Sequence, residues 1–217
     1  MTWAVSRERG GAADFHAREV PTPARRTVWC FEPTAPAVVL GSTQPEATVD
    51  PGACARAGVD VVRRRSGGGA VLLVPGEVLW VDVVLPAGDP LWRDDIGVAP
   101  HWLGAAWAAA LAACDVIGAT VHRGSMVRAP WSDVVCFAGL GPGEVAIDGR
   151  KVVGISQRRT RYFARFQCAA FLAWDPDALV ALLAPPRPTA AALADVATGL
   201  PVSAGDLASA LVAALPA

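Results

Sequence analysis

The sequence predicts an α+β fold in which a mixed, largely antiparallel sheet packs against helices. Residues 78–85 are β-branched and mostly apolar, as in a central strand that is buried on both faces. Asp148-Gly149 lies between alternating apolar residues, which is the strongest short-range signal of a hairpin. Residues 101–114 are rich in alanine, carry no Asp, Glu, Lys or Arg and place Trp and Leu at helical spacing, which predicts a helix between layers.

Length and composition bound the number of domains and the kind of partner. With 217 residues the chain is long enough for one core of ordinary size, and 53% hydrophobic against 18% charged residues indicates a folded globular protein. The net charge of −1 provides no broad attraction for nucleic acid, so we do not expect that class of partner. Arginine clusters at 63–65 and 158–165 are local features that suit a small anionic ligand or an acidic protein.

The cysteines and the N-terminus indicate a cytoplasmic protein. The five cysteines are odd in number and widely spaced without a CxxC pair, which predicts neither a disulfide scaffold nor a zinc site, and we expect no metal held by the protein. No apolar run precedes a cleavage-like site near the N-terminus. Residues 96–114 lack charged side chains, but their alanines and Pro100 favour a buried helix over a membrane span, so no membrane is expected.

The N-terminal half is expected to begin with an arm and two strands. Residues 1–26 are polar and rich in Gly, Ala and Arg, which predicts a weakly ordered arm. Strands are expected at 27–31 and 37–40, separated by a proline-containing turn. Asp50 followed by Pro51 predicts the start of a short helix, because Asp caps a helix well and Pro fits its first position.

The C-terminal half is expected to alternate strands, one long loop and helices. A short strand is predicted at 119–122, and the Gly- and Pro-rich residues 124–143 predict a long loop of the kind that often carries function. Residues 165–174 predict a strand that pairs with the hairpin, and Asp175-Pro176 predicts the start of a helix. Prolines then break the chain, so residues 185–217 are expected to form a short helical tail.

A glycine-rich loop is the most informative stretch. The run RRRSGGG at residues 63–69 places dense positive charge beside a backbone without side chains, so an anionic group can approach the main-chain N–H donors directly. Predicted strands at 59–62 and 70–74 hold the loop at both ends. We therefore predict a phosphate or carboxylate site here, although an isolated Gly triplet is more often a plain turn.

A lysine on the predicted hairpin is the second candidate. Lys151 follows the Asp148-Gly149 turn at the start of the returning strand. An ammonium group on a stiff hairpin is well placed to reach a fixed anion, whereas one on a flexible loop is not. A strand lysine taken alone is more often a solvated edge residue, so its assignment depends on the glycine loop.

These stretches together resemble the family of lipoate–protein ligases and octanoyltransferases, which shares a catalytic module with biotin–protein ligases. The resemblance starts at VVLGSTQ (38–44), continues through VVRRRSGGGAV (61–71) and includes DGRKVVGISQRR (148–159). It covers roughly residues 27 to 175 and implies the biotin/lipoyl ligase, class II synthetase-like fold, with residues 27–184 as the catalytic domain. The tail from 185 is too short for the extra C-terminal domain of larger ligases.

The resemblance also implies which residues carry function. In the family the glycine loop wraps the acyl chain and phosphate of an acyl-adenylate, and a lysine equivalent to Lys151 contacts the reacting carbonyl and phosphate. We therefore predict Lys151 as the catalytic residue. The residues predicted to bind ligand are Gln44, Arg64, Arg65, Ser66, Gly67, Gly68, Gly69, Ala70, Gly154 and Ser156.

Two chemical routes follow from the resemblance, and both attach a lipoyl or octanoyl group to a lysine of a lipoyl carrier domain, either glycine cleavage H protein or a 2-oxoacid dehydrogenase E2. In the ligase route, which we favour, ATP and Mg²⁺ activate lipoate or octanoate as an adenylate. In the transferase route, Cys136 takes the acyl group from an acyl carrier protein thioester. A third reading is a non-catalytic protein that keeps the acyl pocket.

The chain departs from the family at several positions. Many members read GGGAVxHDxGN after the loop, whereas Leu73, Val74 and Glu77 stand at the corresponding positions here. A later QHG reads Gln167-Cys168-Ala169 in this chain. Acyl-chain length, the acyl donor and the oligomeric state do not follow from the sequence.

Overall fold

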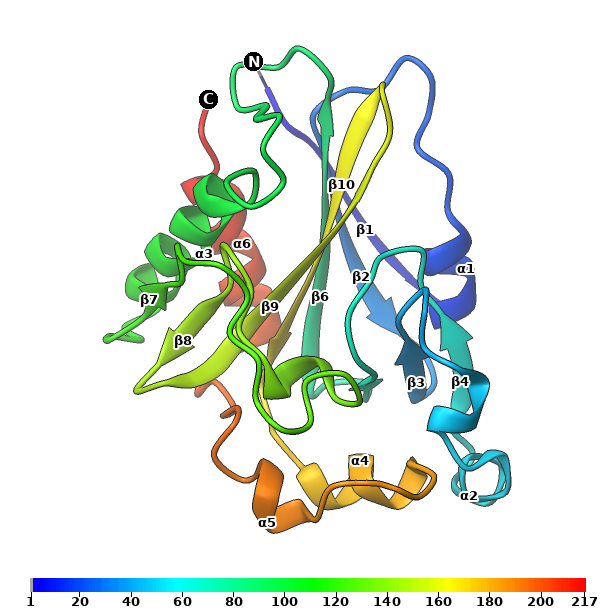
Figure 1. The fold of residues 1–217 in the computed structure, drawn as a ribbon. Coiled ribbons are helices and arrows are strands. Elements are labelled where there is room, and N and C mark those ends of the chain that lie inside the picture. Colours follow the sequence, from blue (N-terminus) through cyan, green and yellow to red (C-terminus); the bar gives the residue numbers. More distant parts are fainter. Residues whose placement is uncertain (1) are drawn as a thin grey trace.

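The computed structural model describes residues 2–217 and contains two sheets (Figure 1). The larger sheet has seven strands in the order β1-β2-β6-β10-β9-β8-β7, and the smaller sheet has the order β4-β3-β5. The strands are β1 (Ala4–Gly10), β2 (Thr27–Pro33), β3 (Ala37–Leu40), β4 (Asp60–Arg63), β5 (Val71–Leu73), β6 (Val78–Pro86), β7 (Thr120–Val121), β8 (Val145–Ile147), β9 (Arg150–Arg159) and β10 (Phe163–Phe171).

Both sheets are mixed and largely antiparallel, so the predicted α+β class is confirmed. The parallel pairs are β1 with β2 in the large sheet and β3 with β4 in the small sheet. The helices are α1 (Ala12–Ala17), α2 (Pro51–Ala57), α3 (His101–Ala113), α4 (Pro176–Leu182), α5 (Ala190–Leu193) and α6 (Ala204–Ala214), with single 3₁₀ turns η1 (Glu46–Thr48) and η2 (Cys136–Ala138).

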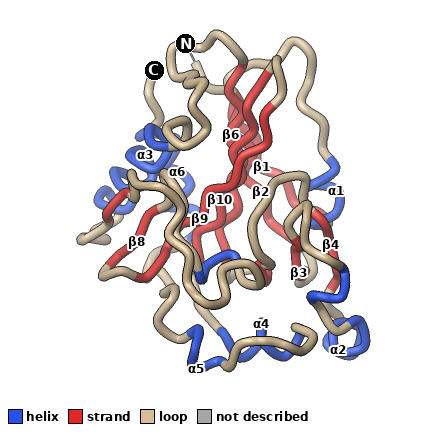
Figure 2. Tube along the Cα trace, in the orientation of Figure 1, coloured by secondary structure: helices blue, strands red, loops and turns tan. Residues whose placement is uncertain are grey.

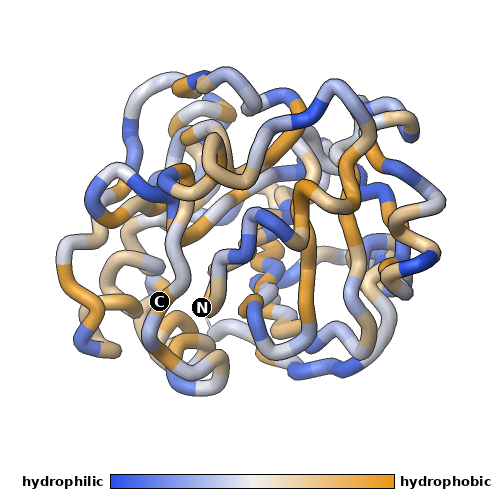
Figure 3. Tube along the Cα trace, turned by 90° about the horizontal axis from the view of Figure 1, so that it is seen from below, coloured by the Kyte–Doolittle hydropathy of each residue, from blue (hydrophilic) through white to orange (hydrophobic). Residues whose placement is uncertain are grey.

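The elements stack in four layers, two of helices and two of strands, and Figure 2 shows the helices in blue around the strands in red. Helices α3 and α6 cover one face of the large sheet, and the small sheet with α1 lies on the other face. Helices α2, α4 and α5 cover the outer face of the small sheet. The hydrophobic segments run along the strands in the middle of the molecule, and hydrophilic stretches are most frequent in peripheral loops (Figure 3).

Strand alternation explains how one sequence fills these layers. In β6, Leu79, Val81 and Val83 face α3 and α6, whereas Trp80 and Val84 face the small sheet. Because successive strand residues point to opposite faces, a strand between two layers must be apolar at nearly every position. This is why β6, paired with β2 and β10, has the uninterrupted apolar character from which it was predicted.

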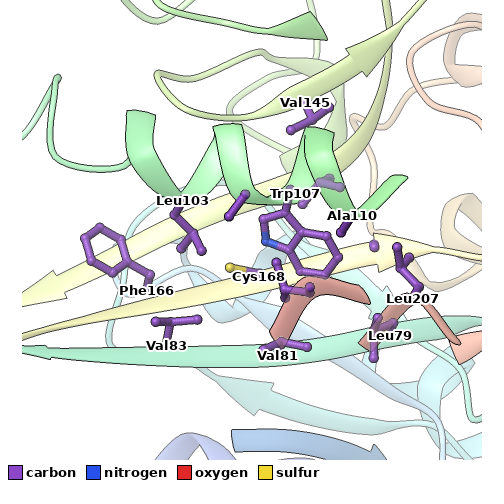
Figure 4. Close-up of a cluster of buried hydrophobic side chains, with 14 of the residues drawn as sticks. Leu79, Val81, Val83, Leu103, Trp107, Ala110, Val145, Phe166, Cys168 and Leu207 are labelled. Atoms are coloured by element: carbon purple, nitrogen blue, oxygen red, sulfur yellow. The ribbon is translucent and has the colours of Figure 1, made fainter. Parts of the chain in front are cut away.

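Helix α3 forms where the sequence predicts a helix. Trp107 is fully buried, and it points from α3 onto the strands of the large sheet beside Cys168 (Figure 4). Leu103 and Phe166 continue the same layer, and Leu207 of α6 closes it. The alanines let α3 approach both the sheet and α6. Its outer face is exposed at Ala105, Ala109, Ala112 and Ala113, so the helix lies on the outside of the sheet and is not enclosed between two layers as expected.

The N-terminal expectation was wrong, because the first residues are part of the fold. Strand β1 pairs with β2 over its whole length, and α1 buries Phe15 and His16. Phe15 stacks on Phe31 with ring centroids 4.2 Å apart, and Arg165 donates to the carbonyl oxygens of Phe15 and Arg18 at 2.6 Å each. The segment is polar only because β1 is an edge strand with a solvent-facing side, which composition alone does not distinguish from an arm.

The hairpin and the helix starts form as predicted. Asp148 and Gly149 both have positive φ, 50° and 78°, which is the backbone that a tight two-residue hairpin needs. Asp50 and Asp175 cap α2 and α4 by accepting hydrogen bonds from backbone N–H groups, each with a proline at the start of the helix. Within the described residues, every helix is too short or too polar to cross a bilayer.

Candidate active site

Two pockets meet between the sheets, and they share Cys136, Ile155 and Ser156. The first is almost entirely apolar and has a volume of about 40 Å³, several times the ~10–15 Å³ that one water needs. Its walls include Val39, Val71, Leu73, Trp80, Phe137, Gly154, Cys168, Ala169 and His16. The second is larger, about 260 Å³, and is lined by the glycine loop, Glu144, Lys151 and the loop residues Ile96 and Met126.

The glycine loop connects the two edges of the small sheet, from β4 to β5, and passes the end of β3. Neighbouring backbone approaches it closely at two points. On one side, a Cβ on Gly41 would lie 1.9 Å from the carbonyl oxygen of Gly68. On the other side, a Cβ on Gly69 would lie 2.6 Å from the backbone nitrogen of Cys136. Two of the loop's close approaches therefore require glycine for steric reasons.

Arg64 organises this loop from beneath. Its guanidinium is buried and donates to the carbonyl oxygens of Gly67 at 2.9 Å, Gly69 at 2.8 Å and Val39 at 3.3 Å. Because C=O and the following N–H point in opposite directions across a trans peptide, the N–H of Gly68 faces away from Arg64. Within residues 2–217, the amides of Gly67, Gly68 and Gly69 donate to no protein acceptor, and all three glycines line the polar pocket.

The three consecutive arginines therefore have different partners. Arg63 donates to the carbonyl oxygens of Gly41 and Gln44, and Arg64 holds the loop carbonyls. Arg65 is half-exposed and pairs with Glu19 at the surface. The dense positive charge expected from the sequence is therefore used mainly to fix backbone, and the donors that the pocket presents are main-chain amides.

Lys151 lies at the start of β9 with its side chain 2% exposed. Its ammonium donates to the backbone oxygen of Cys136 at 2.8 Å and to Glu144 Oε2 at 2.9 Å. It also lies 4.7 Å from the centre of the Phe137 ring, on whose face a cation is attracted. The alternative that Lys151 is a solvated residue at a strand edge is wrong, since its amine is buried in the wall of the polar pocket.

Cys136 occupies the border of the two pockets. It is half-buried at the start of η2, and its Sγ lies 3.9 Å from Arg64 Nη2. Its backbone N–H donates to the carbonyl of Ala70, and the Ala70 N–H donates to the carbonyl of Val134. These bonds tie the long loop 124–143 to the glycine loop and place the thiol beside both pockets.

A buried polar chain runs below the apolar pocket. The Ser66 hydroxyl lies 2.9 Å from both Ser156 Oγ and Gln167 Oε1, and Gln167 Nε2 lies 3.1 Å from Nδ1 of His16. Burial, with smaller contributions from the charges of Arg64 and Arg165, lowers the pKa of His16 to about 3. The imidazole is therefore neutral at physiological pH.

The remaining predicted ligand residues have mainly structural contacts. Gln44 accepts from the Gly41 N–H and donates to the carbonyls of Asp133 and Val134, so it joins two loops. Gly154 lies under the Phe137 ring, where a Cβ would be 3.1 Å from a ring carbon. Ala70 is fully buried and makes only backbone bonds toward the 134–136 segment.

Four residues at the site were not singled out from the sequence: Glu144, Phe137, Trp80 and His16. His16 and Trp80 come from segments far from Phe137 and Glu144, and no spacing rule connects the four. One compositional signal did exist for Lys151, because it is the only lysine in the chain and the other eighteen residues of the Lys and Arg total are arginines. An arginine cannot replace a compact ammonium in this small enclosure.

The departures from the family pattern fall into two places. Leu73 and Cys168 line the apolar pocket, where they stand at positions that are polar in the family pattern. Val74 and Glu77 lie instead beside Trp174 at a separate small pocket. The departures therefore make the first pocket more hydrophobic and leave the glycine loop and Lys151 intact.

A comparison with protein families matches residues 12–212 to the lipoyl protein ligase A/B catalytic domain. The chain belongs to that family. A search of curated proteins finds no match. The matched range of this lipoyl protein ligase A/B domain includes α1 and α6, in agreement with their packing onto the large sheet.

Solved structures of similar fold are lipoate ligases. A putative lipoate protein ligase from T. acidophilum with bound lipoic acid is 17% identical, with a TM-score of 0.73 over 98% of this chain and 83% of that one. A lipoate-protein ligase A bound with ATP is 17% identical, with a TM-score of 0.70 over the same shares. A bipartite ligase of Thermoplasma acidophilum, described with its E2 lipoyl domain, is 18% identical, with a TM-score of 0.71 over 98% and 81%.

The described residues do not form a Mg²⁺ site of their own. No three His, Cys, Asp or Glu side chains gather as metal ligands within residues 2–217. Glu144 is the carboxylate that lines the polar pocket, and its oxygens already accept from Gly141, Lys151 and Ile155. Mg²⁺ prefers free carboxylate oxygens together with phosphate, so this set of residues does not fit the ion.

Proposed function

We propose that the protein transfers a lipoyl or octanoyl group to the lysine of a lipoyl carrier domain. Family membership and the paired pockets support this function. The narrow apolar pocket suits a saturated acyl chain, and the wider polar pocket leaves room for the activated carboxyl group and the incoming amine. The carrier domain is expected to be an E2 lipoyl domain or glycine cleavage H protein.

The observation that carries the chemical route is the position of Cys136 at the border of the two pockets. An acyl chain in the apolar pocket would place its carbonyl carbon at this border. The thiolate of Cys136 would attack that carbon, the donor's C–S bond would break, and the carrier thiol would leave with the proton released by Cys136. This favours the thioester route over the ATP route that the sequence favoured.

The second half of the reaction would transfer the acyl group to the carrier and regenerate the free thiol of Cys136. The neutral amine of the carrier lysine attacks the thioester carbon, the bond to Cys136 Sγ breaks, and the amine proton passes to the departing thiolate. Both halves develop negative charge on the acyl oxygen. The free amides of Gly67, Gly68 and Gly69 and the ammonium of Lys151 are donors that can stabilise this charge, an effect worth about 10²–10³ in rate for a single donor elsewhere.

The ligase route is a second candidate, supported by the same free amides. Three adjacent N–H groups and a cation suit a phosphate as well as an oxyanion. One structurally similar ligase was solved with ATP. In this route ATP activates free lipoate or octanoate, and Cys136 has no covalent role.

One experiment separates the candidates. The protein is incubated with an E2 lipoyl domain and either octanoyl-loaded acyl carrier protein without ATP, or octanoate or lipoate with ATP and Mg²⁺, and intact mass is measured. In the thioester arm, the wild-type protein should raise the mass of the carrier domain by one octanoyl group. The rate of this acylation should fall about 10³-fold or more in Cys136→Ser. Cys114→Ser, a half-buried cysteine at the end of α3, is the matched control and should stay active.

Other outcomes point elsewhere. Acylation only with ATP, retained in Cys136→Ser, would establish the ligase route and overturn the thioester route. Absence of carrier acylation in both arms, together with binding of octanoate by calorimetry, would identify a non-catalytic acyl-binding protein.

A further inference from the structure

Glu144 is the polar-pocket residue with the most complete set of partners. It follows Gly143, whose φ of 80° turns the chain into β8, and its side chain is 7% exposed. Its Oε2 accepts from the N–H of Gly141 at 2.6 Å and from Lys151 at 2.9 Å, and its Oε1 accepts from the N–H of Ile155 at 3.1 Å. The carboxylate is thus fixed by the backbone at Gly141 and by two residues of β9 before any ligand arrives.

The partners of Lys151 form the other half of this arrangement. An ammonium has three N–H donors, and Glu144 and the Cys136 carbonyl occupy two of them. The face of Phe137 lies against the cation. A carboxylate, a carbonyl and an aromatic face therefore hold the Lys151 amine at one position in the wall of the polar pocket.

We propose that Glu144 is the positioning residue that fixes Lys151 beside Cys136, and that it acts on acyl transfer only through Lys151. The proposal rests on the proposed function. Glu144 bonds to Lys151, and Lys151 bonds to the backbone oxygen of Cys136, so the three residues form one chain across the border of the pockets. Glu144 itself needs no contact with the acyl group.

The isosteric variant Glu144→Gln removes the charge and one acceptor. Whichever way its amide turns, an NH₂ group that cannot accept replaces one of the two oxygens, and the ammonium loses its counter-charge while the side-chain volume stays the same. We expect kcat to fall about 10²-fold, as for a small misplacement of a reacting group, with the KM for the acyl donor changed only a few-fold. Glu144→Asp restores the charge and should recover part of the rate, and Glu46→Gln, at an exposed carboxylate, is the control.

A double-variant comparison separates positioning from general structure. In a Lys151→Met background, adding Glu144→Gln should lower the rate by less than about two-fold, because its target is already gone. The same addition should raise the thermal midpoint of Lys151→Met, because it neutralises a carboxylate that has lost its cation. If the two rate losses instead multiply, Glu144 acts independently of Lys151 and the proposal is wrong.

A readout without turnover distinguishes this proposal from the proposed function. Because Lys151 is the only lysine, lysine-selective ¹⁵N labelling gives a side-chain Nζ signal from this residue alone. Its protons should exchange slowly with water in wild type and markedly faster in Glu144→Gln. An unchanged signal would overturn the positioning role, whereas a changed signal in a protein that acylates no carrier would leave the contact established and remove the proposed function.

Discussion

The pKa of His16 shows how burial changes the protonation of a single residue. It contributes to the wall of the apolar pocket, stacks near Trp80 with ring centroids 4.4 Å apart, and contacts Gln167 through Nδ1. Burial and two neighbouring arginines lower its pKa to about 3, well below the ordinary 6.5. The neutral ring therefore belongs to the folded state, and protonation opposes folding.

This gives a pH dependence with a definite sign. Between pH 6.5 and about 3 the unfolded chain binds a proton at His16 that the folded chain does not, so the free energy of unfolding falls as pH falls. The part due to His16 should be about 3 kcal/mol between pH 7 and pH 4. Urea unfolding at both values should show a smaller fall for His16→Asn than for wild type. An equal fall in His122→Asn and His16→Asn would contradict the assignment.

The position or role of some site residues can be predicted from the sequence, and that of others cannot. The place of Lys151 follows from the Asp148-Gly149 turn, because a two-residue hairpin fixes where the returning strand begins. The role of Arg64 does not, because a basic run beside glycines suggests an anion, and only the fold shows that its partners are the loop's own carbonyls. Glu144 was equally hidden, since only the fold shows that this carboxylate accepts from Gly141 and from Lys151 and Ile155 of β9.

At the scale of elements, the glycine loop works because neighbouring backbones approach it on two sides. The three glycines are not equivalent: a Cβ on Gly67 would meet nothing within 4 Å, whereas one on Gly69 would lie 2.6 Å from backbone atoms of Val135 and Cys136. The loop and the segment that carries Cys136 are therefore one packed unit.

The two glycines provide a matched pair of variants. Gly67→Ala should fold and transfer acyl groups within a few-fold of wild type, because its Cβ points into open space. Gly69→Ala should lose at least about 10²-fold in rate, because the backbone at Cys136 must shift to make room. Carrier acylation measured by intact mass, with circular dichroism for folding, tests both. Equal activity of the two variants would mean that the loop and the Cys136 segment move independently.

The elements were easier to predict than their roles. β6, α3 and the β8–β9 hairpin have strong local signals, because burial on both faces, helical spacing and a two-residue turn each leave a pattern in consecutive residues. Loop 124–143 has no such pattern, since its course depends on bonds to the distant residues Gln44 and Ala70.

At the scale of the whole molecule, the N-terminal segment closes the layer that contains the apolar pocket. α1 supplies His16 to the wall, and Phe15 packs on Phe31 and Trp80. Sequence periodicity could not show this, because β1 pairs with β2 (Ala4 with Thr27) and β2 with β6 (Phe31 with Trp80) at separations that local patterns do not encode. Likewise, only the assembled fold shows that α3 and α6 lie on one face of the large sheet and the small sheet on the other.

This placement predicts a large effect from one N-terminal substitution. Phe15→Ala should lower the free energy of unfolding by about 3–5 kcal/mol, the usual result of removing a buried aromatic ring. Asp14→Asn, at the exposed neighbouring position, should stay within about 0.5 kcal/mol of wild type. Urea titration measures the free energy of unfolding of both variants. If the value for Phe15→Ala equals that of wild type, the N-terminal segment does not contribute to the stability of the fold.

The solitary lysine has one more consequence under the proposed function. Reactive thioesters and mixed anhydrides modify exposed lysines on any protein nearby, and a protein that holds such a group is the nearest target of all. This chain carries its positive charge as arginine, whose guanidinium stays protonated, and its lone amine is 2% exposed with a carboxylate and a carbonyl as partners. The activated acyl group therefore finds no reactive lysine on its own enzyme and persists until a carrier presents one.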